Sequence, residues 1–261
     1  MFFEELGIYY EVYGEGKPLI LLNGIMMSTA SWSEHIKILS KYFKVIVYDM
    51  RDQGKSSKVK NEYDISLHSE DLKKLIDYLG IEKVNLLGLS YGGQVAEIFA
   101  SKYPEYIDKL ILSNTTYKVD NYLSSIGDAW KVAAKTYDGE KFFDLALPFI
   151  YSKTFYNDNY QWLLNRRKIF KELLTKEWFD SFIRLASSNI NFDVSNDLEK
   201  IQCETLLIAA DEDIITPISD MEYIKSKIPN SEMIVIKNSG HAVFLEKIDT
   251  YCNIIKGFLI Y

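Results

Sequence analysis

Residues Gly88 to Gly92 read Gly-Leu-Ser-Tyr-Gly, which places a serine between two glycines. An apolar run typical of a buried strand precedes this segment, and a stretch typical of a helix follows it. At a sharp strand-to-helix turn, glycines let the backbone approach closely and hold a serine in strained geometry with its hydroxyl exposed. The spacing in this context predicts that Ser90 is a nucleophile rather than an incidental serine of a glycine-rich loop.

A serine hydroxyl is a poor nucleophile until a base removes its proton and a third group orients that base. The chain offers three histidines as bases. His35 and His68 fall inside predicted helices, where a hydrogen-bonded or solvent-facing histidine is the simpler interpretation. His241 follows the last predicted strand, in a loop at the same sheet edge as Ser90. We therefore predict that His241 is the base.

The acid is expected after another strand at that edge, and residues 205–210 run into Asp211, Glu212 and Asp213. The turn that ends at Thr216 leaves Asp213 past the end of the strand. Asp211 is close enough to the strand to be a turn residue. Asp213 is therefore the favoured acid.

Short apolar runs alternate with longer amphipathic stretches along most of the chain, which is typical of buried strands separated by covering helices. The first two runs alternate like an antiparallel hairpin, and Ser66 has the position of a helix N-cap. The pattern predicts an α/β protein with strands at 2–5, 8–13, 18–22, 45–48, 84–89, 110–113, 205–209 and 233–236, and with helices at 31–41, 66–79, 91–102, 218–227 and 243–258.

One region interrupts the alternation. From about residue 116 to 200 no buried strand is predicted, and the stretch is rich in Trp, Tyr and Phe. It is interpreted as several helices inserted between two strands. We expect residues 1–115 and 202–261 to form the sheet core, and residues 116–201 to form a helical cap whose aromatic side chains supply its own core and an apolar acyl pocket.

Together these features resemble the α/β-hydrolase superfamily, in the carboxylesterase-like branch of serine hydrolases that carries a helical cap. The order Ser90, Asp213, His241 is the triad order of that fold. The resemblance implies a mostly parallel eight-stranded sheet flanked by helices, and an oxyanion hole formed by the backbone N–H groups of Ile25 and Tyr91. It rests on residues 21–24, 48–56, 88–93, 210–217, 240–241 and 245–246.

Three positions depart from the family pattern or bear on its alternatives. Asn23 stands before Gly24 where the family usually has histidine, and we expect it to alter how the oxyanion loop is braced. The family commonly has Gly-x-Gly where this chain has Asp52, Gln53 and Gly54, and we expect this difference to affect only the local structure. The family can also place its acid after the sixth strand, but Asn114 occupies that place and is no carboxylate.

Composition and motif spacing argue against several other classes of protein. The formal net charge of −7 argues against a nucleic-acid partner. Cys203 and Cys252 form no paired spacing, so neither structural zinc nor a disulfide framework is expected, and no cofactor is implied. Gly54-Lys55-Ser56 lacks the first glycine of a phosphate loop. With no signal peptide and no membrane span in the sequence, a cytoplasmic location is expected, and no oligomeric state is indicated.

These expectations describe a serine hydrolase that cleaves a carboxylic ester, with a small apolar acyl substrate, through an acyl-enzyme on Ser90. A thioester, a lactone or a C–C bond next to a carbonyl is open to the same triad. A ligand receptor that keeps the fold without catalysis is the alternative from another class.

Overall fold

The computed structural model describes residues 1–260 and contains one eight-stranded sheet, with strand order β1-β2-β4-β3-β5-β6-β7-β8. The β1–β2 and β2–β4 pairs are antiparallel, and every other neighbouring pair is parallel. The predicted mostly parallel sheet is thereby confirmed. Its strands are β1 (Phe2–Phe3), β2 (Ile8–Tyr13), β3 (Pro18–Leu22), β4 (Lys44–Tyr48), β5 (Val84–Leu89), β6 (Ile107–Ser113), β7 (Glu204–Ala210) and β8 (Ser231–Ile236).

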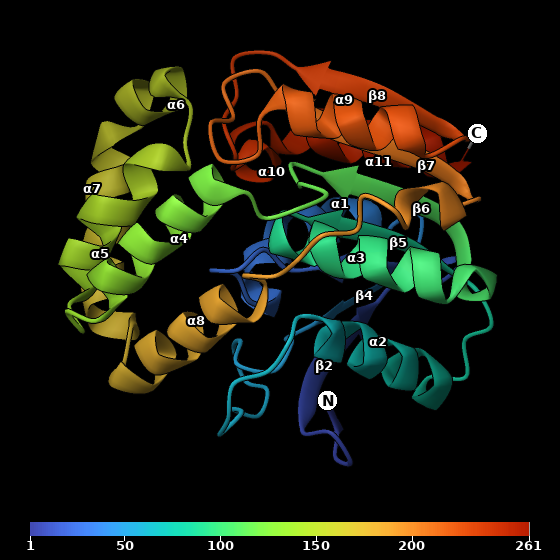
Figure 1. Cartoon of the computed structure of the whole chain (residues 1–261), viewed down its shortest axis with the longest axis horizontal. Helices are drawn as coiled ribbons and strands as arrows, with labels where there is room; N and C mark the ends of the chain where they lie inside the picture. The colour runs from blue at the N-terminus through green and yellow to red at the C-terminus, as the bar shows by residue number, and fades with distance from the viewer. Residues whose placement is uncertain (261) are drawn as a thin grey trace.

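Helices cover both faces of the sheet (Figure 1). Along β3, Leu19 and Leu21 pack into the core beneath α1 and α11, whereas Ile20 and Leu22 pack into the core beneath α2, α3 and α9. Because successive side chains of a strand point to opposite faces, a strand buried on both faces must be apolar throughout. These helices are α1 (Ser33–Leu39), α2 (Ser66–Tyr78), α3 (Tyr91–Lys102), α9 (Ile218–Lys227), α10 (Val243–Glu246) and α11 (Ile248–Ile260).

Two helix boundaries differ from the sequence-based expectation. Ser66 is the first helical residue of α2 rather than its N-cap, and the Asp64 carboxylate accepts a hydrogen bond from Ser66 N at 2.9 Å. The segment expected as one helix over 243–258 is two helices, because Lys247 leaves the helical region with φ −134° and ψ 47°. No glycine or proline marks that break in the sequence.

Five α-helices fill the chain between β6 and β7 and gather at one side of the sheet (Figure 1). Phe142, Phe179 and Phe182 are buried among them, with edge-to-face ring contacts at 5.8 Å and 5.1 Å from Phe142. The aromatic residues of this stretch thus supply a core for these inserted helices, which are α4 (Asn121–Ala134), α5 (Gly139–Ala146), α6 (Lys153–Asp158), α7 (Tyr160–Leu173) and α8 (Lys176–Ser188).

The two cysteines lie apart, Cys203 before β7 and Cys252 in α11, and both are free. Burial raises the pKa of the Cys252 thiol to about 12. Within residues 1–260, no cluster of three or more His, Cys, Asp or Glu side chains is arranged to hold a metal ion. No helix in that range combines the length and apolar character needed to cross a membrane.

Candidate active site

Ser90 occupies the turn between β5 and α3, with φ 54° and ψ −117°. Positive φ is strained for a residue with a side chain. The neighbouring glycines explain why the turn forms here: a Cβ on Gly88 would collide with the carbonyl oxygen of Gly92, and a Cβ on Gly92 would lie 2.6 Å from the carbonyl oxygen of Leu22. Only glycine at these two positions lets the helix start pack this closely against the strand ends.

Hydrogen bonds hold the Ser90 backbone on both sides. Its N–H donates to the Ser113 carbonyl at 2.9 Å, which continues the pairing of β5 with β6. Its carbonyl oxygen accepts from Gly93 N at 2.7 Å and from Thr115 Oγ1 at 2.9 Å. The strained turn is therefore fixed by its surroundings, and the serine side chain projects from a rigid support.

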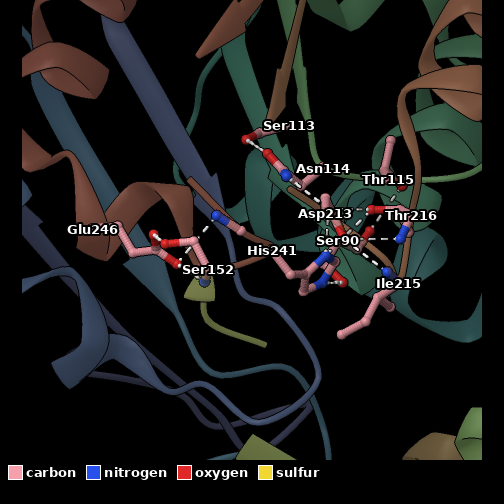
Figure 2. Close-up of polar contacts among 11 residues, drawn as sticks. Ser90, Ser113, Asn114, Thr115, Ser152, Asp213, Ile215, Thr216, His241 and Glu246 are labelled. Carbon is pink, nitrogen blue, oxygen red and sulfur yellow. Dashed lines mark hydrogen bonds and ion pairs between the residues drawn. The ribbon is translucent and has the colours of Figure 1, made fainter. Parts of the chain in front are cut away.

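Ser90, Asp213 and His241 meet in one hydrogen-bonded chain (Figure 2). His241 Nε2 lies 2.8 Å from Ser90 Oγ, and His241 Nδ1 lies 2.8 Å from Asp213 Oδ2. The three residues follow β5, β7 and β8, whose parallel carboxyl ends lie at one edge of the sheet. This is the arrangement in which a carboxylate orients a histidine and the histidine takes the proton of a serine.

Asp213 is buried, and its carboxylate is fully surrounded by donors. Oδ1 accepts from Ile215 N at 2.9 Å and from Thr216 N at 3.0 Å, while Oδ2 also accepts from Thr216 Oγ1 at 2.8 Å and from Asn114 Nδ2 at 2.7 Å. Burial favours a higher pKa for Asp213. The charge and hydrogen bond of His241, together with the hydrogen bonds from Asn114 and Thr216, outweigh this effect, and the pKa of Asp213 is lowered. The carboxylate is therefore ionised at neutral pH.

The other acid candidates point elsewhere. Asp211 is half-buried and its carboxylate lies 3.4 Å from Ser239 N, and Glu212 accepts from Lys153 N at 3.1 Å. Asn114, at the family's alternative acid position, instead donates its amide to Asp213. The residues after β5, β6, β7 and β8 thus all contribute to one network, and the contribution after β6 is an amide that sequence reasoning treated only as a missing carboxylate.

The other two histidines, His35 and His68, are buried and take no part in the hydrogen bonds that join Ser90, His241 and Asp213. His35 Nε2 bonds the Phe244 carbonyl at 2.8 Å, and burial lowers the pKa of His35 to about 4. Burial also lowers the pKa of His68 to about 3, and neither of its ring nitrogens has a hydrogen-bond partner among residues 1–260. The expectation of a hydrogen-bonded or solvent-facing histidine is wrong for His68, because α2 carries it into an aromatic contact with Tyr63 and Tyr91.

The two predicted oxyanion donors flank the serine. Ile25 follows β3 and Tyr91 begins α3, and both line a small cavity of about 60 Å³ together with Ser90. Across the described part of the chain, 1–260, neither backbone N–H donates to another group. Two unused amides beside a serine hydroxyl are free to bind an oxygen that develops negative charge.

The loop that carries Ile25 is held by a buried amide network. Trp32 Nε1 donates to Asn23 Oδ1 at 2.8 Å, and Asn23 Nδ2 donates to the Tyr48 carbonyl at 3.0 Å and to Gln53 Oε1 at 3.1 Å. Gln53 Nε2 donates to the Gly24 carbonyl at 2.9 Å. Asn23, a departure from the family pattern, therefore bonds to Gln53, and together they brace the loop.

A cavity of about 520 Å³ opens beside Ser90 and His241. One wall comes from the loop after β3, including Ile25 and Met27, and a second wall comes from the inserted helices. Aromatic and aliphatic side chains dominate that second wall, so an apolar group fits there. The wall residues from the insert include Trp130, Leu147, Ile150, Tyr151, Phe155, Trp162, Arg166 and Phe170.

The inserted helices also hold the loop that carries His241 (Figure 2). Glu246 Oε1 accepts from Ser152 N at 2.9 Å and from Gly240 N at 3.2 Å, and Glu246 Oε2 accepts from Ser152 Oγ at 2.6 Å. Ala242 N donates to the Ile150 carbonyl at 3.0 Å. A Cβ on Gly240 would lie 2.5 Å from Ser152 N, so glycine is needed where the two segments meet. No local sequence signal indicates this contact between positions 94 residues apart.

Comparisons with known proteins agree with this architecture. A family model described as alpha/beta hydrolase fold matches residues 17–248. The putative carbamate hydrolase RutD of Caulobacter sp. (strain K31) is 25% identical over 262 residues, which cover 97% of this chain and 96% of that protein. The poly(3-hydroxyalkanoate) depolymerase of Ectopseudomonas oleovorans is 27% identical over 243 residues, 93% of this chain and 84% of its own. The crystal structure of MGS-M2, an alpha/beta hydrolase enzyme from a Medee basin deep-sea metagenome library, has a TM-score of 0.94 and 37% identity, and the match covers 97% of this chain and 94% of that one.

Proposed function

Because the chain belongs to the α/β-hydrolase family, we propose that it is a serine hydrolase that cleaves a carboxylic ester or a related acyl bond through an acyl-enzyme on Ser90. The observation that carries this proposal is the continuous hydrogen-bonded chain from Ser90 Oγ through His241 to Asp213, with both links at 2.8 Å. A binding protein has no need for a strained serine bonded to a histidine whose other nitrogen is held by a buried carboxylate.

In the first half-reaction, Ser90 Oγ attacks the carbonyl carbon while His241 Nε2 takes the hydroxyl proton. Asp213 fixes the tautomer of His241 through Nδ1 and stabilises the imidazolium that forms. The backbone amides of Ile25 and Tyr91 are the proposed donors to the oxyanion, each worth about 3 kcal/mol of barrier by comparison with a measured donor deletion. His241 then gives its proton to the leaving alcohol, and water, activated by His241 in turn, hydrolyses the acyl-enzyme.

The network around Asp213 suits this role. A carboxylate with an already lowered pKa stays charged, so it retains its hold on His241 as the imidazole gains a proton. Ile215, Thr216 and Asn114 occupy the remaining acceptor positions of the carboxylate, which prevents it from turning away from His241.

We further propose that residues 116–201 act as a cap over the core formed by 1–115 and 202–261. Support comes from the cavity, whose floor holds Ser90 and whose second wall belongs to the inserted helices. The apolar lining favours a small acyl substrate with an apolar part. The relatives' names describe a carbamate hydrolase and a depolymerase, which agrees with hydrolysis but indicates no single substrate.

Labelling with a fluorophosphonate probe tests the proposal. The wild-type protein should be labelled at Ser90, Ser90→Ala should abolish labelling, and Ser33→Ala, which alters another serine of the cavity wall, should keep it. A kinetic panel of esters and thioesters graded by acyl length then identifies the bond that is cleaved. A folded wild-type protein that remains unlabelled would refute the hydrolase proposal and favour a ligand receptor.

A further inference from the structure

Arg166, on α7, lines the same 520 Å³ cavity as Ser90. Its Nε atom is buried, and no acceptor among residues 1–260 lies within hydrogen-bond distance of that atom. The next residue behaves differently: Arg167 forms ion pairs with Asp144 and with Glu140, each at 2.7 Å. Two consecutive arginines on one helix therefore have opposite surroundings, and only Arg166 faces the cavity.

Aromatic rings hold the Arg166 guanidinium in the cavity wall. Its Cζ lies 4.8 Å from the ring centroid of Trp162 and 5.9 Å from that of Phe170. Cation–π contacts of this kind partly desolvate a guanidinium while its edge donors stay available. The Tyr151 side chain lines the same cavity: burial raises the pKa of its hydroxyl, and the nearby charge of Arg166 opposes that rise. A second potential donor thus lies close to the guanidinium.

The cavity contains no counterion for Arg166. Across the described residues 1–260, no carboxylate lies within ion-pair distance of its guanidinium. Glu34, the acidic residue of the cavity wall, is 55% exposed and forms an ion pair with Lys37 at 2.6 Å. A partly desolvated cation without a partner is unfavourable, and an anionic ligand would relieve that cost.

We propose that Arg166 binds a carboxylate carried by the substrate, so that the natural substrate is an ester with a free carboxylate at the end remote from the scissile carbonyl. The fixed fork of guanidinium donors matches the two oxygens of a carboxylate. Tyr151 lines the same cavity and adds a hydroxyl group near the guanidinium. This inference rests on the proposed hydrolase function, because Ser90 defines the end of the cavity where the ester lies.

Binding to the Ser90→Ala protein tests the inference without turnover. Isothermal titration calorimetry compares monomethyl adipate with methyl hexanoate and with the methyl ester of adipamic acid, which replaces the carboxylate by a neutral amide of similar shape. Monomethyl esters of longer and shorter dicarboxylic acids extend the series. We expect at least one carboxylate ester to bind about 10-fold to 100-fold more tightly than its two neutral counterparts, as is typical of a hydrogen bond to a charged group.

Substitution of Arg166 then tests whether this residue causes the preference for a carboxylate. Arg166→Met should remove the 10-fold to 100-fold preference, while neutral esters bind within about twofold of their former affinity. Arg166→Lys keeps the charge and should keep part of the preference for a carboxylate. Such partial retention would show that the loss in Arg166→Met is not caused by misfolding. Lys168→Met, which removes an exposed charge from the same helix, should change neither.

Two results would overturn the inference. One is equal affinity for charged and neutral esters at every chain length, and the other is a carboxylate preference that Arg166→Met leaves intact. Failure of Ser90 labelling in the wild type, with the carboxylate preference retained, would instead refute the hydrolase proposal and leave the anion site standing. The chain length that binds best measures the separation between Arg166 and the Ser90 position.

Discussion

His241 and His68 contact adjacent residues, Ser90 and Tyr91, and have contrasting surroundings. His241 bonds Ser90 through one ring nitrogen and Asp213 through the other, each at 2.8 Å. His68 packs its ring 5.8 Å from that of Tyr91, the residue after Ser90, and 5.3 Å from that of Tyr63. Neither nitrogen of His68 has a partner within residues 1–260.

The contrast shows that the polar partners, rather than the residue type, decide what a histidine can do. Burial without partners lowers the pKa of His68 to about 3, so its ring is neutral and can only fill space between aromatic side chains. At the sheet edge, the carboxylate of Asp213 lies within hydrogen-bond distance of Nδ1 and fixes the orientation of the His241 ring. Both ring nitrogens of His68, on α2, lack partners within residues 1–260, whereas both ring nitrogens of His241, at the sheet edge, are hydrogen-bonded.

The largest expected effect comes from breaking the partnership at the sheet edge. Asp213→Asn should lower kcat/KM for ester hydrolysis by about 10⁴-fold, because an amide at this position favours the wrong tautomer of the histidine. Asp211→Asn is the matched control and should cost less than about tenfold, since Asp211 contacts the Ser239 amide and not His241. Steady-state kinetics on one ester substrate measure both, and the reverse ranking would show that the acid is misassigned.

A smaller effect should follow from loosening the support of the His241 loop. Ser152→Ala removes the hydroxyl that donates to Glu246, a hydrogen bond to a charged acceptor. If part of that bond's energy positions the loop, kcat should fall about 3-fold to 10-fold with KM little changed.

Ser125→Ala, at an exposed serine of α4, is the control for the Ser152 substitution. The pH dependence of kcat separates a role of Ser152 in positioning His241 from a simple loss of protein stability. Displacement of His241 changes the acid limb of the kcat profile, whereas a loss of stability does not. A lower melting temperature with unchanged kcat and an unchanged pH profile would contradict the positioning role.

The smallest effect on activity is expected at His68. His68→Leu should leave the rate of ester hydrolysis within about threefold, because the ring makes no hydrogen bond within residues 1–260. Its effect should appear in stability instead. The folded-state pKa of about 3 lies below the ordinary 6.5, so the unfolded chain binds a proton that the folded protein excludes, and wild-type stability falls as the pH drops below 6.5.

Urea unfolding at pH 7 and pH 5 checks this linkage. Between these two values the wild type should lose ~2 kcal/mol more unfolding free energy than His68→Leu does. The variant should retain the part due to His35, whose pKa is lowered to about 4. Equal losses in both proteins would mean that His68 is protonated, or reaches water, in the folded state.

Local signals in the sequence predicted the fold and the residues that the structure brings together. The glycines around Ser90 are required by backbone contacts within a few residues, and apolar runs define strands whose carboxyl ends share one edge. Asp213 and His241 follow from those strand ends. Their catalytic roles, and those of Ile25 and Tyr91, remain predictions that the experiments above address.

What sequence reasoning missed depends on contacts between distant residues. The Glu246–Ser152 bond joins positions 94 residues apart, and the amide of Asn114 reaches Asp213 across 99 residues. The orphaned ring of His68 arises from the packing of α2 against α3. The break at Lys247 coincides with the side chain of Glu246 reaching toward the insert. None of these features has a local pattern, because each is decided by what the rest of the fold places nearby.

The docking of residues 150–153 on the sheet edge sets a limit for protein engineering. This segment offers the Ile150 carbonyl to Ala242, two Ser152 donors to Glu246 and the Lys153 amide to Glu212. A chimera that exchanges the whole insert between relatives would discard these contacts along with the cavity wall. We therefore expect an exchange of the inserted helices to preserve activity only when residues 150–153 stay with the host scaffold.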